Sequence, residues 1–199
     1  MICCVDTSYN PFEAMRTFIA VDLDDRLKTH FIHIINKLDT GDRSIKWITR
    51  QGMHITLKFL GEISESQKSE VERILDNVTN RHSSFLLQFR GSGTFPHNSR
   101  NPRVLWIGVD KNEAFETLHA DIEEEMAGIG FPKDNRPFHP HLTLCRVKKK
   151  GQLLTVLNKH QQYRREHFGD IIVKKVIYYR SILKPTGAEY SVLSEHKLK

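Results

Sequence analysis

The 199-residue chain has no apolar run of the roughly 18 residues that a membrane-spanning helix requires. It also begins without the basic residues, apolar stretch and small-residue cleavage site of a secretory signal peptide. Three cysteines are an odd number, and no Cys-x-x-Cys pair is present. This argues against a disulfide framework. We therefore expect a soluble protein of the reducing cytoplasm, without a membrane partner.

Two motifs of nucleotide chemistry are also missing. There is no glycine-rich phosphate loop and no adenylation-type lysine motif, so ATP-driven ligation has no support. What the chain does have is basic charge: lysine plus arginine exceed aspartate plus glutamate by 30 − 24 = 6, and the pI is near 9.2. That excess suits a polyanionic partner such as RNA.

Residues 1–14 differ from the rest of the chain because they have no hydrophobic periodicity. Met15 then opens "MRTFIAVDL", a clear strand start. We interpret residues 1–14 as an N-terminal extension that is dispensable for folding and activity. Residues 15–199 are expected to form a single domain with two lobes.

Short apolar, β-branched runs alternate with amphipathic stretches along this domain. Asp24 is a candidate helix cap, and Ser64-Glu-Ser-Gln67 has the pattern of a capping box. A loop rich in glycine, proline, asparagine and serine is expected at 90–103. The expected strands are 16–23, 44–49, 54–60, 85–89, 104–110, 141–147, 171–183 and 189–198. The expected helices are 24–38, 64–78, 115–126 and 153–163.

An internal repeat connects the two halves of the chain. "IAVD" at 19–22 matches "IGVD" at 107–110 with an offset of 88. "HITL" at 54–57 matches "HLTL" at 141–144 with an offset of 87. Because strand, helix and motif strand recur in the same order, we infer a duplicated αβ unit. Packing about a pseudo-two-fold axis would bring the two motif strands face to face in a central cleft.

Each repeated motif places a histidine and a threonine on one face of its strand, because successive side chains alternate. His54 and Thr56 share a face, and so do His141 and Thr143. Two imidazoles facing each other can serve as general acid and general base near neutral pH. Each threonine hydroxyl can donate to a non-bridging phosphate oxygen. The arrangement suits in-line displacement at a phosphodiester.

Two other interpretations of the histidines remain open. A single His-x-Thr in a strand is usually structural, but two copies at a matched offset favour a function. A metal site is the second alternative, because His139 and His141 lie near each other and His54 could converge on them. Neither cysteine nor carboxylate stands beside them at ligand spacing, and Pro140 interrupts the pair. We expect no metal and no cofactor.

Four segments together resemble the 2H phosphoesterase superfamily: "MRTFIAVDL", "HITLKFLGE", "NPRVLWIGVD" and "RPFHPHLTLCRV". In particular, they are similar to the RNA 2′,3′-cyclic phosphodiesterases once called 2′-5′ RNA ligases, from Met15 to about Leu193. The resemblance implies an α+β fold in which duplicated αβ lobes with antiparallel sheets surround a central cleft, with helices outside. It also implies metal-independent hydrolysis of RNA 2′,3′-cyclic phosphate ends to 2′-phosphates. Some members act on 2′-5′ linkages or join them weakly.

By motif position, the resemblance makes His54 and His141 the catalytic pair and Thr56 and Thr143 the phosphate donors. In the wider superfamily, the first histidine protonates the leaving O3′ and the second activates water. The residue five positions after the second histidine is a phosphate-contacting arginine, here Arg146.

Further candidates lie on the same strands. The resemblance gives Phe59 a contact to the nucleoside, with core packing as the alternative. By alternation Lys58 falls on the His54 face and becomes a second candidate for phosphate. Alternation also puts Arg146 opposite His141, so a bulge or strand end must turn it. Cys145 falls on the His141 face, and we assign it no role.

Three functions compete. The first is the cyclic phosphodiesterase, acting on an RNA end or a nucleotide as a monomer without an obligate protein partner. The second is a non-catalytic nucleotide or RNA-end binder on the same scaffold, which the presence of both histidines disfavours. The third is a 2′-5′ RNA ligase, which we expect only as a side activity because hydrolysis is favoured in water.

Overall fold

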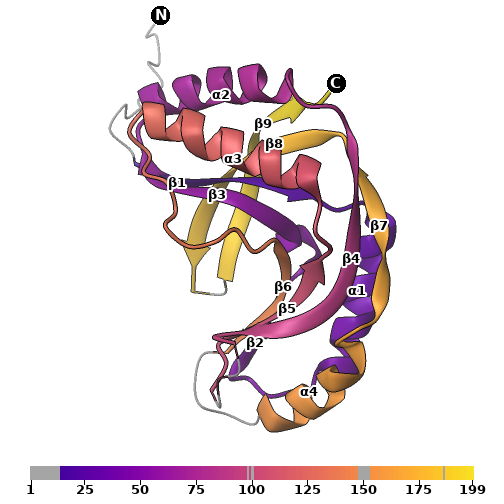
Figure 1. Cartoon of the computed structure of the whole chain (residues 1–199). Coiled ribbons are helices and arrows are strands. Elements are labelled where there is room, and N and C mark those ends of the chain that lie inside the picture. Colours follow the sequence, from indigo (N-terminus) through magenta and orange to yellow (C-terminus); the bar gives the residue numbers. More distant parts are fainter. Residues whose placement is uncertain (1–13, 98, 100, 148–152, 186) are drawn as a thin grey trace, which may run out of the picture.

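The computed structural model describes residues 14–97, 99, 101–147, 153–185 and 187–199. Of the expected N-terminal extension, all but Ala14 lies outside these residues. Nine strands in the described ranges form one antiparallel sheet that curls strongly (Figure 1). They are β1 (Met15–Asp22), β2 (Ile45–Trp47), β3 (His54–Ile63), β4 (Phe85–Phe95), β5 (Val104–Val109), β6 (His141–Val147), β7 (His167–Val173), β8 (Lys175–Lys184) and β9 (Gly187–Lys197).

The sheet has two halves that meet at the motif strands. Its order is β7-β4-β5-β6-β3-β1-β8-β9, with β2 paired to β6. One half holds β3, β1, β8 and β9, and the other holds β6, β5, β4 and β7. The two expected lobes are therefore halves of one continuous sheet, joined where β3 pairs with β6.

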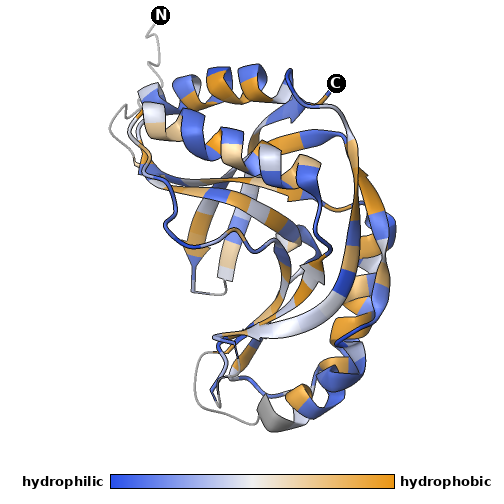
Figure 2. Ribbon diagram, in the orientation of Figure 1, coloured by the Kyte–Doolittle hydropathy of each residue, from blue (hydrophilic) through white to orange (hydrophobic). Residues whose placement is uncertain are grey.

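Helices cover the convex side of the curl and leave the concave side open (Figure 1). Two of them, α2 and α3, pack on the β3 half, and α1 and α4 lie along the β7 edge. Each mixes hydrophobic and hydrophilic residues along its length, as an amphipathic helix does (Figure 2). No helix in the described ranges is long and apolar enough to span a bilayer. The helices are α1 (Asp25–Leu38), α2 (Glu65–Thr79), α3 (Glu113–Gly128) and α4 (Leu153–His160), with short 3₁₀ turns η1 (Arg50–Gly52) and η2 (Gln161–Tyr163).

The helix starts predicted from the sequence are confirmed. Asp24 caps α1 by accepting a hydrogen bond from the Leu27 amide at 2.7 Å. Ser64 and Gln67 form the full capping box at the start of α2. These caps satisfy amide donors that a helix start otherwise leaves unpaired.

Two predicted elements were wrong. The single strand expected at 171–183 is two strands that separate at Lys174: β7 pairs with β4, whereas β8 pairs with β1 in the other half. The loop expected from residue 90 begins later, because β4 continues to Phe95. Its glycines suggested a loop, but the Trp106 indole lies directly over Gly93, where a Cβ would sit 2.3 Å from the ring. Gly93 is therefore required by a close approach within the sheet.

Strand pairing also corrects the register of the internal repeat. Asp22 pairs with His54, whereas Gly108 pairs with His141. The structural offset is thus 108 − 22 = 86, two residues less than the sequence match. As a result, the neighbour of Thr56 on β1 is Ala20, whereas the neighbour of Thr143 on β5 is Trp106. The second motif therefore has a large aromatic residue where the first has a methyl group.

Each motif strand contains a bulge just after its threonine. Along β3 the pairing with β1 jumps from Thr56 to Lys58, and along β6 the pairing with β5 jumps from Thr143 to Cys145. The extra residues are Leu57 and Leu144, at the repeat offset of 87. A bulge resets the alternation of side chains. Residues after it therefore face opposite to where simple alternation puts them.

The bulge makes the expectation for Lys58 wrong. Instead of facing the open side with His54, Lys58 is 5% exposed and turns toward α3. Its ammonium donates to Glu123 Oε2 at 2.8 Å and to the Pro132 carbonyl at 2.9 Å. The Asp134 amide donates to the same carboxylate oxygen at 2.9 Å. This buried ion pair ties β3 to the segment that leads into β6.

We expect Lys58→Met to lower the free energy of unfolding by about 3–5 kcal/mol, because it leaves the Glu123 carboxylate buried and unpaired. Adding Glu123→Leu should recover part of the loss, since the uncompensated charge is removed. Urea denaturation of both variants measures this. Arg81→Met removes an exposed ion pair with Glu125 and should cost no more than about 1 kcal/mol. An equal loss in the Lys58 and Arg81 variants would contradict a special role for the buried pair.

Candidate active site

The two motif strands touch at their centres. Ile55 pairs with Leu142 in antiparallel register, and both side chains are fully buried. Continuing this register by one residue in each direction sets His54 opposite Thr143 and Thr56 opposite His141. The two histidines then lie on one diagonal and the two threonines on the other, all four on the open face. The expected convergence of the two motifs follows from this one pair.

His54 sits in an aromatic, half-buried setting. Its ring centroid lies 4.7 Å from Phe18, 5.2 Å from Tyr190 and 5.9 Å from Tyr179. Burial, followed by the positive charges of Arg146 and Lys28 and by His141, lowers the pKa of His54 to about 4. The imidazole is therefore neutral at pH 7 in the free protein.

His141 is held by the chain that precedes it. Its Nδ1 lies 2.7 Å from the carbonyl oxygen of His139. A carbonyl only accepts, so Nδ1 carries the proton and donates, and in the neutral ring Nε2 keeps a free lone pair. Burial lowers the pKa of His141, and the bond to the His139 carbonyl opposes this. His141 is thus oriented as a proton acceptor at Nε2.

The threonines of both motifs are half-buried on the same face. In the described part of the chain, neither Thr56 nor Thr143 has a hydrogen bond from its hydroxyl to the protein. Arg146 acts electrostatically on both histidines, which places its guanidinium near each of them. The two hydroxyls and the guanidinium are hydrogen-bond donors on the open face of the sheet.

Phe59 and Arg146, each two residues after the extra leucine of its bulge, are exposed, as the reset of alternation requires. Arg146 turns to the open side because Leu144 is the extra residue of its strand. Phe59 is 62% exposed and its ring centroid lies 5.9 Å from Phe18, so the core-packing alternative for Phe59 is wrong. Phe59 extends the aromatic surface that begins beside His54.

Cys145 is on the other face from His141, contrary to simple alternation. It is fully buried in the core, and burial raises its pKa to about 12. A thiol in that environment is not a nucleophile at neutral pH. Among the described residues, no group of three or more His, Cys, Asp or Glu side chains is arranged to hold a metal ion.

A family model described as the 2′-5′ RNA ligase superfamily matches residues 24–168, which include both motifs. The chain belongs to this superfamily. Its relatives include an RNA 2′,3′-cyclic phosphodiesterase of Archaeoglobus fulgidus, 36% identical over 90% of this chain and 98% of the relative. One from Methanothermobacter thermautotrophicus is 32% identical over 92% of this chain and 99% of the relative.

Two solved structures share the fold of this chain. The protein TT0787 of Thermus thermophilus aligns with a TM-score of 0.79 at 26% identity, covering 92% of this chain and 98% of that one. E. coli LigT complexed with 3′-AMP aligns with a TM-score of 0.77 at 23% identity, covering 94% and 99%. The α+β fold with antiparallel strands and outer helices, expected from the resemblance, is confirmed, with the strands of both lobes in one curled sheet.

Several residues around the superfamily motifs were missed by the sequence analysis. Lys28 lies near His54 and forms an ion pair with Asp22 at 2.6 Å. Asp22 is the backbone neighbour of His54 on β1, so only the strand pairing reveals this contact. Tyr179 and Tyr190 come from the C-terminal hairpin, beyond the region where the repeat can be followed. Phe18 had a sequence signal, since it directly precedes the repeated "IAVD".

The low pKa of His54 predicts how stability depends on pH. The unfolded chain binds a proton at His54 near pH 6.5, whereas the folded chain binds it near pH 4. The contribution of neutral His54 to the free energy of unfolding is therefore complete above pH 6.5. It decreases by about 3 kcal/mol in total as the pH falls from 6.5 to 4. Urea denaturation at pH 7 and pH 4 should show this decrease in the wild type. In His54→Gln, the free energy of unfolding should decrease between the two pH values by about 3 kcal/mol less than in the wild type. An identical pH dependence in the two proteins would contradict the low pKa.

Proposed function

We propose that this protein hydrolyses RNA 2′,3′-cyclic phosphate ends to 2′-phosphates, with two histidines as acid and base and without a metal. The observation that carries the proposal is the pairing of Ile55 with Leu142, which puts both His-x-Thr motifs on one face. Relatives named RNA 2′,3′-cyclic phosphodiesterase, at 32–36% identity, support this activity.

His141 is the general base in this proposal. Because its Nδ1–H is engaged by the His139 carbonyl, the lone pair on Nε2 is free to take a proton from water. The water oxygen attacks phosphorus as its proton passes to Nε2.

His54 is the general acid on the opposite side of the phosphorus. As the bond from phosphorus to O3′ breaks, His54 gives its proton to O3′, which leaves a 2′-phosphate and a free 3′-hydroxyl. In the free protein His54 is neutral at pH 7, because burial and nearby positive charges lower its pKa. A phosphodiester anion beside the ring favours the charged imidazolium and raises that pKa. The substrate itself thus promotes the protonation that the acid requires.

Thr56, Thr143 and Arg146 stabilise the charge that builds on the non-bridging oxygens. Two hydroxyl donors and one guanidinium are preorganised there, so little rearrangement is needed as the transition state forms. Phe59, exposed on the His54 side, offers a flat face for the base of the terminal nucleoside.

A non-catalytic RNA-end binder is the alternative on the same scaffold. Both histidines are present, and the ring nitrogens of His141 are set for proton transfer rather than only for contact. These features favour the enzyme.

Hydrolysis should survive chelation, because two imidazoles, two hydroxyls and a guanidinium already supply acid, base and oxyanion donors. We expect adenosine 2′,3′-cyclic phosphate, incubated with the protein in excess EDTA, to give adenosine 2′-phosphate. Chromatography against the two phosphate isomers identifies the product. Turnover lost in EDTA and restored by zinc or magnesium would favour the metal alternative, and a 3′-phosphate product would reverse the assignment of the leaving oxygen.

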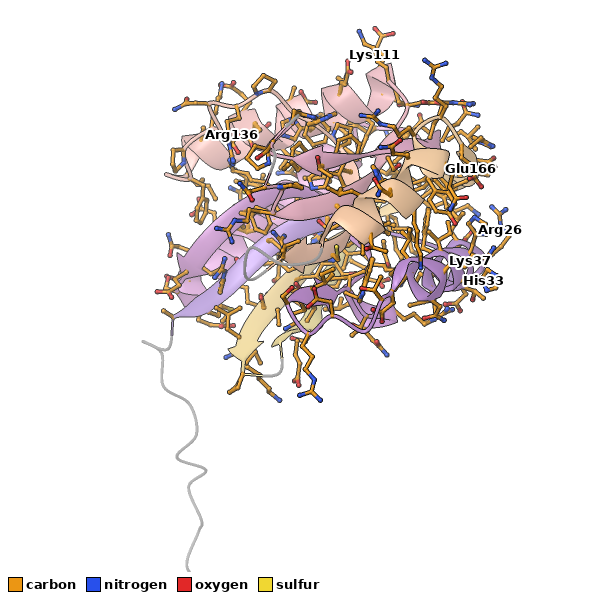
Figure 3. The ribbon with its side chains drawn as sticks, turned by 90° about the horizontal axis from the view of Figure 1, so that it is seen from below. Arg26, His33, Lys37, Lys111, Arg136 and Glu166 are labelled. Atoms are coloured by element: carbon orange, nitrogen blue, oxygen red, sulfur yellow. The ribbon has the colours of Figure 1, made fainter. Side chains whose placement is uncertain are left out.

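His54→Ala and His141→Ala should each lower kcat by about 10²–10⁴-fold, the usual scale of acid–base catalysis. The double variant should be little worse than either, because the two act in one displacement. Thr56→Ala and Thr143→Ala should cost less, and the wild-type pH–rate profile should be bell-shaped. His33→Ala, on the outer surface of α1 (Figure 3), is the matched control and should be unaffected. Near-normal kcat with weakened RNA-end binding in both histidine variants would establish the binder instead.

A further inference from the structure

The segment between α3 and β6, residues 129–140, carries the carbonyl that orients the proposed base (Figure 1). His139 contributes that carbonyl, and only Pro140 separates it from His141. Proline fixes its own φ, and it restricts the backbone of the residue before it to extended conformations. The direction of the His139 carbonyl therefore depends on where the chain is held at the preceding residue, Phe138.

Two contacts hold this segment against α3. The first is the buried carboxylate of Glu123, which accepts hydrogen bonds from the Lys58 ammonium and the Asp134 amide. The second is a ring stack four residues further along the chain. The Phe138 ring lies flat on the imidazole of His119, with ring centroids 3.7 Å apart and ring planes 8° from parallel. The stack thus fixes the segment directly before the carbonyl that orients the base.

The stack is packed into the protein rather than lying loose on its surface. The Phe138 ring is half-buried and also meets Phe115 edge to face, with ring centroids 5.4 Å apart. The side chain of His119 is 16% exposed, and its Nε2 lies 3.8 Å from Oε1 of Glu123. Burial lowers the pKa of His119, although the charge of Glu123 opposes this, so its ring is neutral at pH 7. A neutral ring can be covered by Phe138 without the cost of burying a charge.

We propose that His119 is a positioning residue for the general base. It lies on α3, on the convex side of the sheet and away from the open face. By stacking on Phe138 it holds the His139 carbonyl against Nδ1 of His141, which keeps the proton on Nδ1 and the lone pair on Nε2. This rests on the function proposed above.

Loss of the stack changes which nitrogen of His141 carries the proton. We expect the segment to shift and the hydrogen bond from Nδ1 to the His139 carbonyl to weaken. The neutral ring then also populates the tautomer with its proton on Nε2. An Nε2 that carries a proton has no lone pair to accept one from water, so a smaller fraction of the protein is ready to react.

The kinetic test compares His119→Ala with His119→Phe, which keeps a flat ring over Phe138. His119→Ala should lower kcat for adenosine 2′,3′-cyclic phosphate about 10-fold with little change in KM, because the imidazole of His141 remains and only its orientation is relaxed. The acidic limb of the pH–rate profile should move to lower pH, since the bond to the His139 carbonyl raises the pKa of His141. His119→Phe should retain most of the wild-type kcat.

His82→Ala is the matched control. The side chain of His82 is 11% exposed, and its Nε2 lies 2.9 Å from Oδ2 of Asp121, so it contacts α3 without contributing to the stack. This variant should be less stable in urea, but its kcat and pH–rate profile should not change. Phe138→Leu should behave like His119→Ala, and the double variant should be little worse than either, because both substitutions remove the same contact.

The tautomer of His141 gives a readout that does not depend on turnover. The ¹⁵N NMR shifts of its ring nitrogens should place the proton on Nδ1 in the wild type. The population with the proton on Nε2 should rise in His119→Ala but not in His119→Phe or His82→Ala.

Three results would overturn the positioning role and leave the proposed function standing. They are an unchanged His141 tautomer in His119→Ala, an unchanged kcat in that variant, and an equal loss of kcat in His119→Phe or His82→Ala. A wild type that does not hydrolyse the cyclic phosphate would instead overturn the proposed function. The NMR measurement would then still decide whether His119 holds His141 in one tautomer.

Discussion

The antiparallel pairing of Ile55 with Leu142 is the constraint on which the site depends. A strand alternates its side chains with a period of two, so burying these two residues forces both His-x-Thr pairs onto the opposite, open face. The antiparallel register also makes the arrangement two-fold, with each histidine across from the other motif's threonine. A shift of one residue in this register would bury the histidines and expose the core.

Two bulges then divide the polar residues of the motif strands between site and core. After Leu57 and Leu144 the faces exchange, so Phe59 and Arg146 reach the open side. The same exchange of faces puts the side chains of Lys58 and Cys145 in the interior. The buried ammonium of Lys58 is satisfied by hydrogen bonds to Glu123 and to the Pro132 carbonyl. The same local irregularity, which occurs twice, thus supplies an exposed aromatic ring, an exposed guanidinium and a buried ion pair that anchors the segment before β6.

The surroundings of the histidines match the charge of a phosphodiester. Burial lowers the pKa of both His54 and His141; the positive charge of Arg146 adds to this at both, and that of Lys28 at His54. A bound anion beside the rings would favour the charged imidazolium and so raise the pKa of these histidines. Because Trp106 lies beside Thr143 where Ala20 lies beside Thr56, the two motifs have different surroundings. As a result, the rings of Phe95 and Trp106 lie close to His141, with centroids 5.0 and 6.4 Å away.

The sequence by itself determined the repeat, the strand–helix order, the helix caps and the two motifs, because these depend on local periodicity and on short-range hydrogen bonds. It also determined that His54 shares a face with Thr56, and His141 with Thr143. Only the tertiary structure decided where residues after the bulges point, because a bulge depends on the partner strand. The division of 171–183 between two halves of the sheet, the burial of Lys58 and the gathering of Phe95, His97, Trp106 and His139 depend on contacts between distant segments. No local pattern in the chain encodes those contacts.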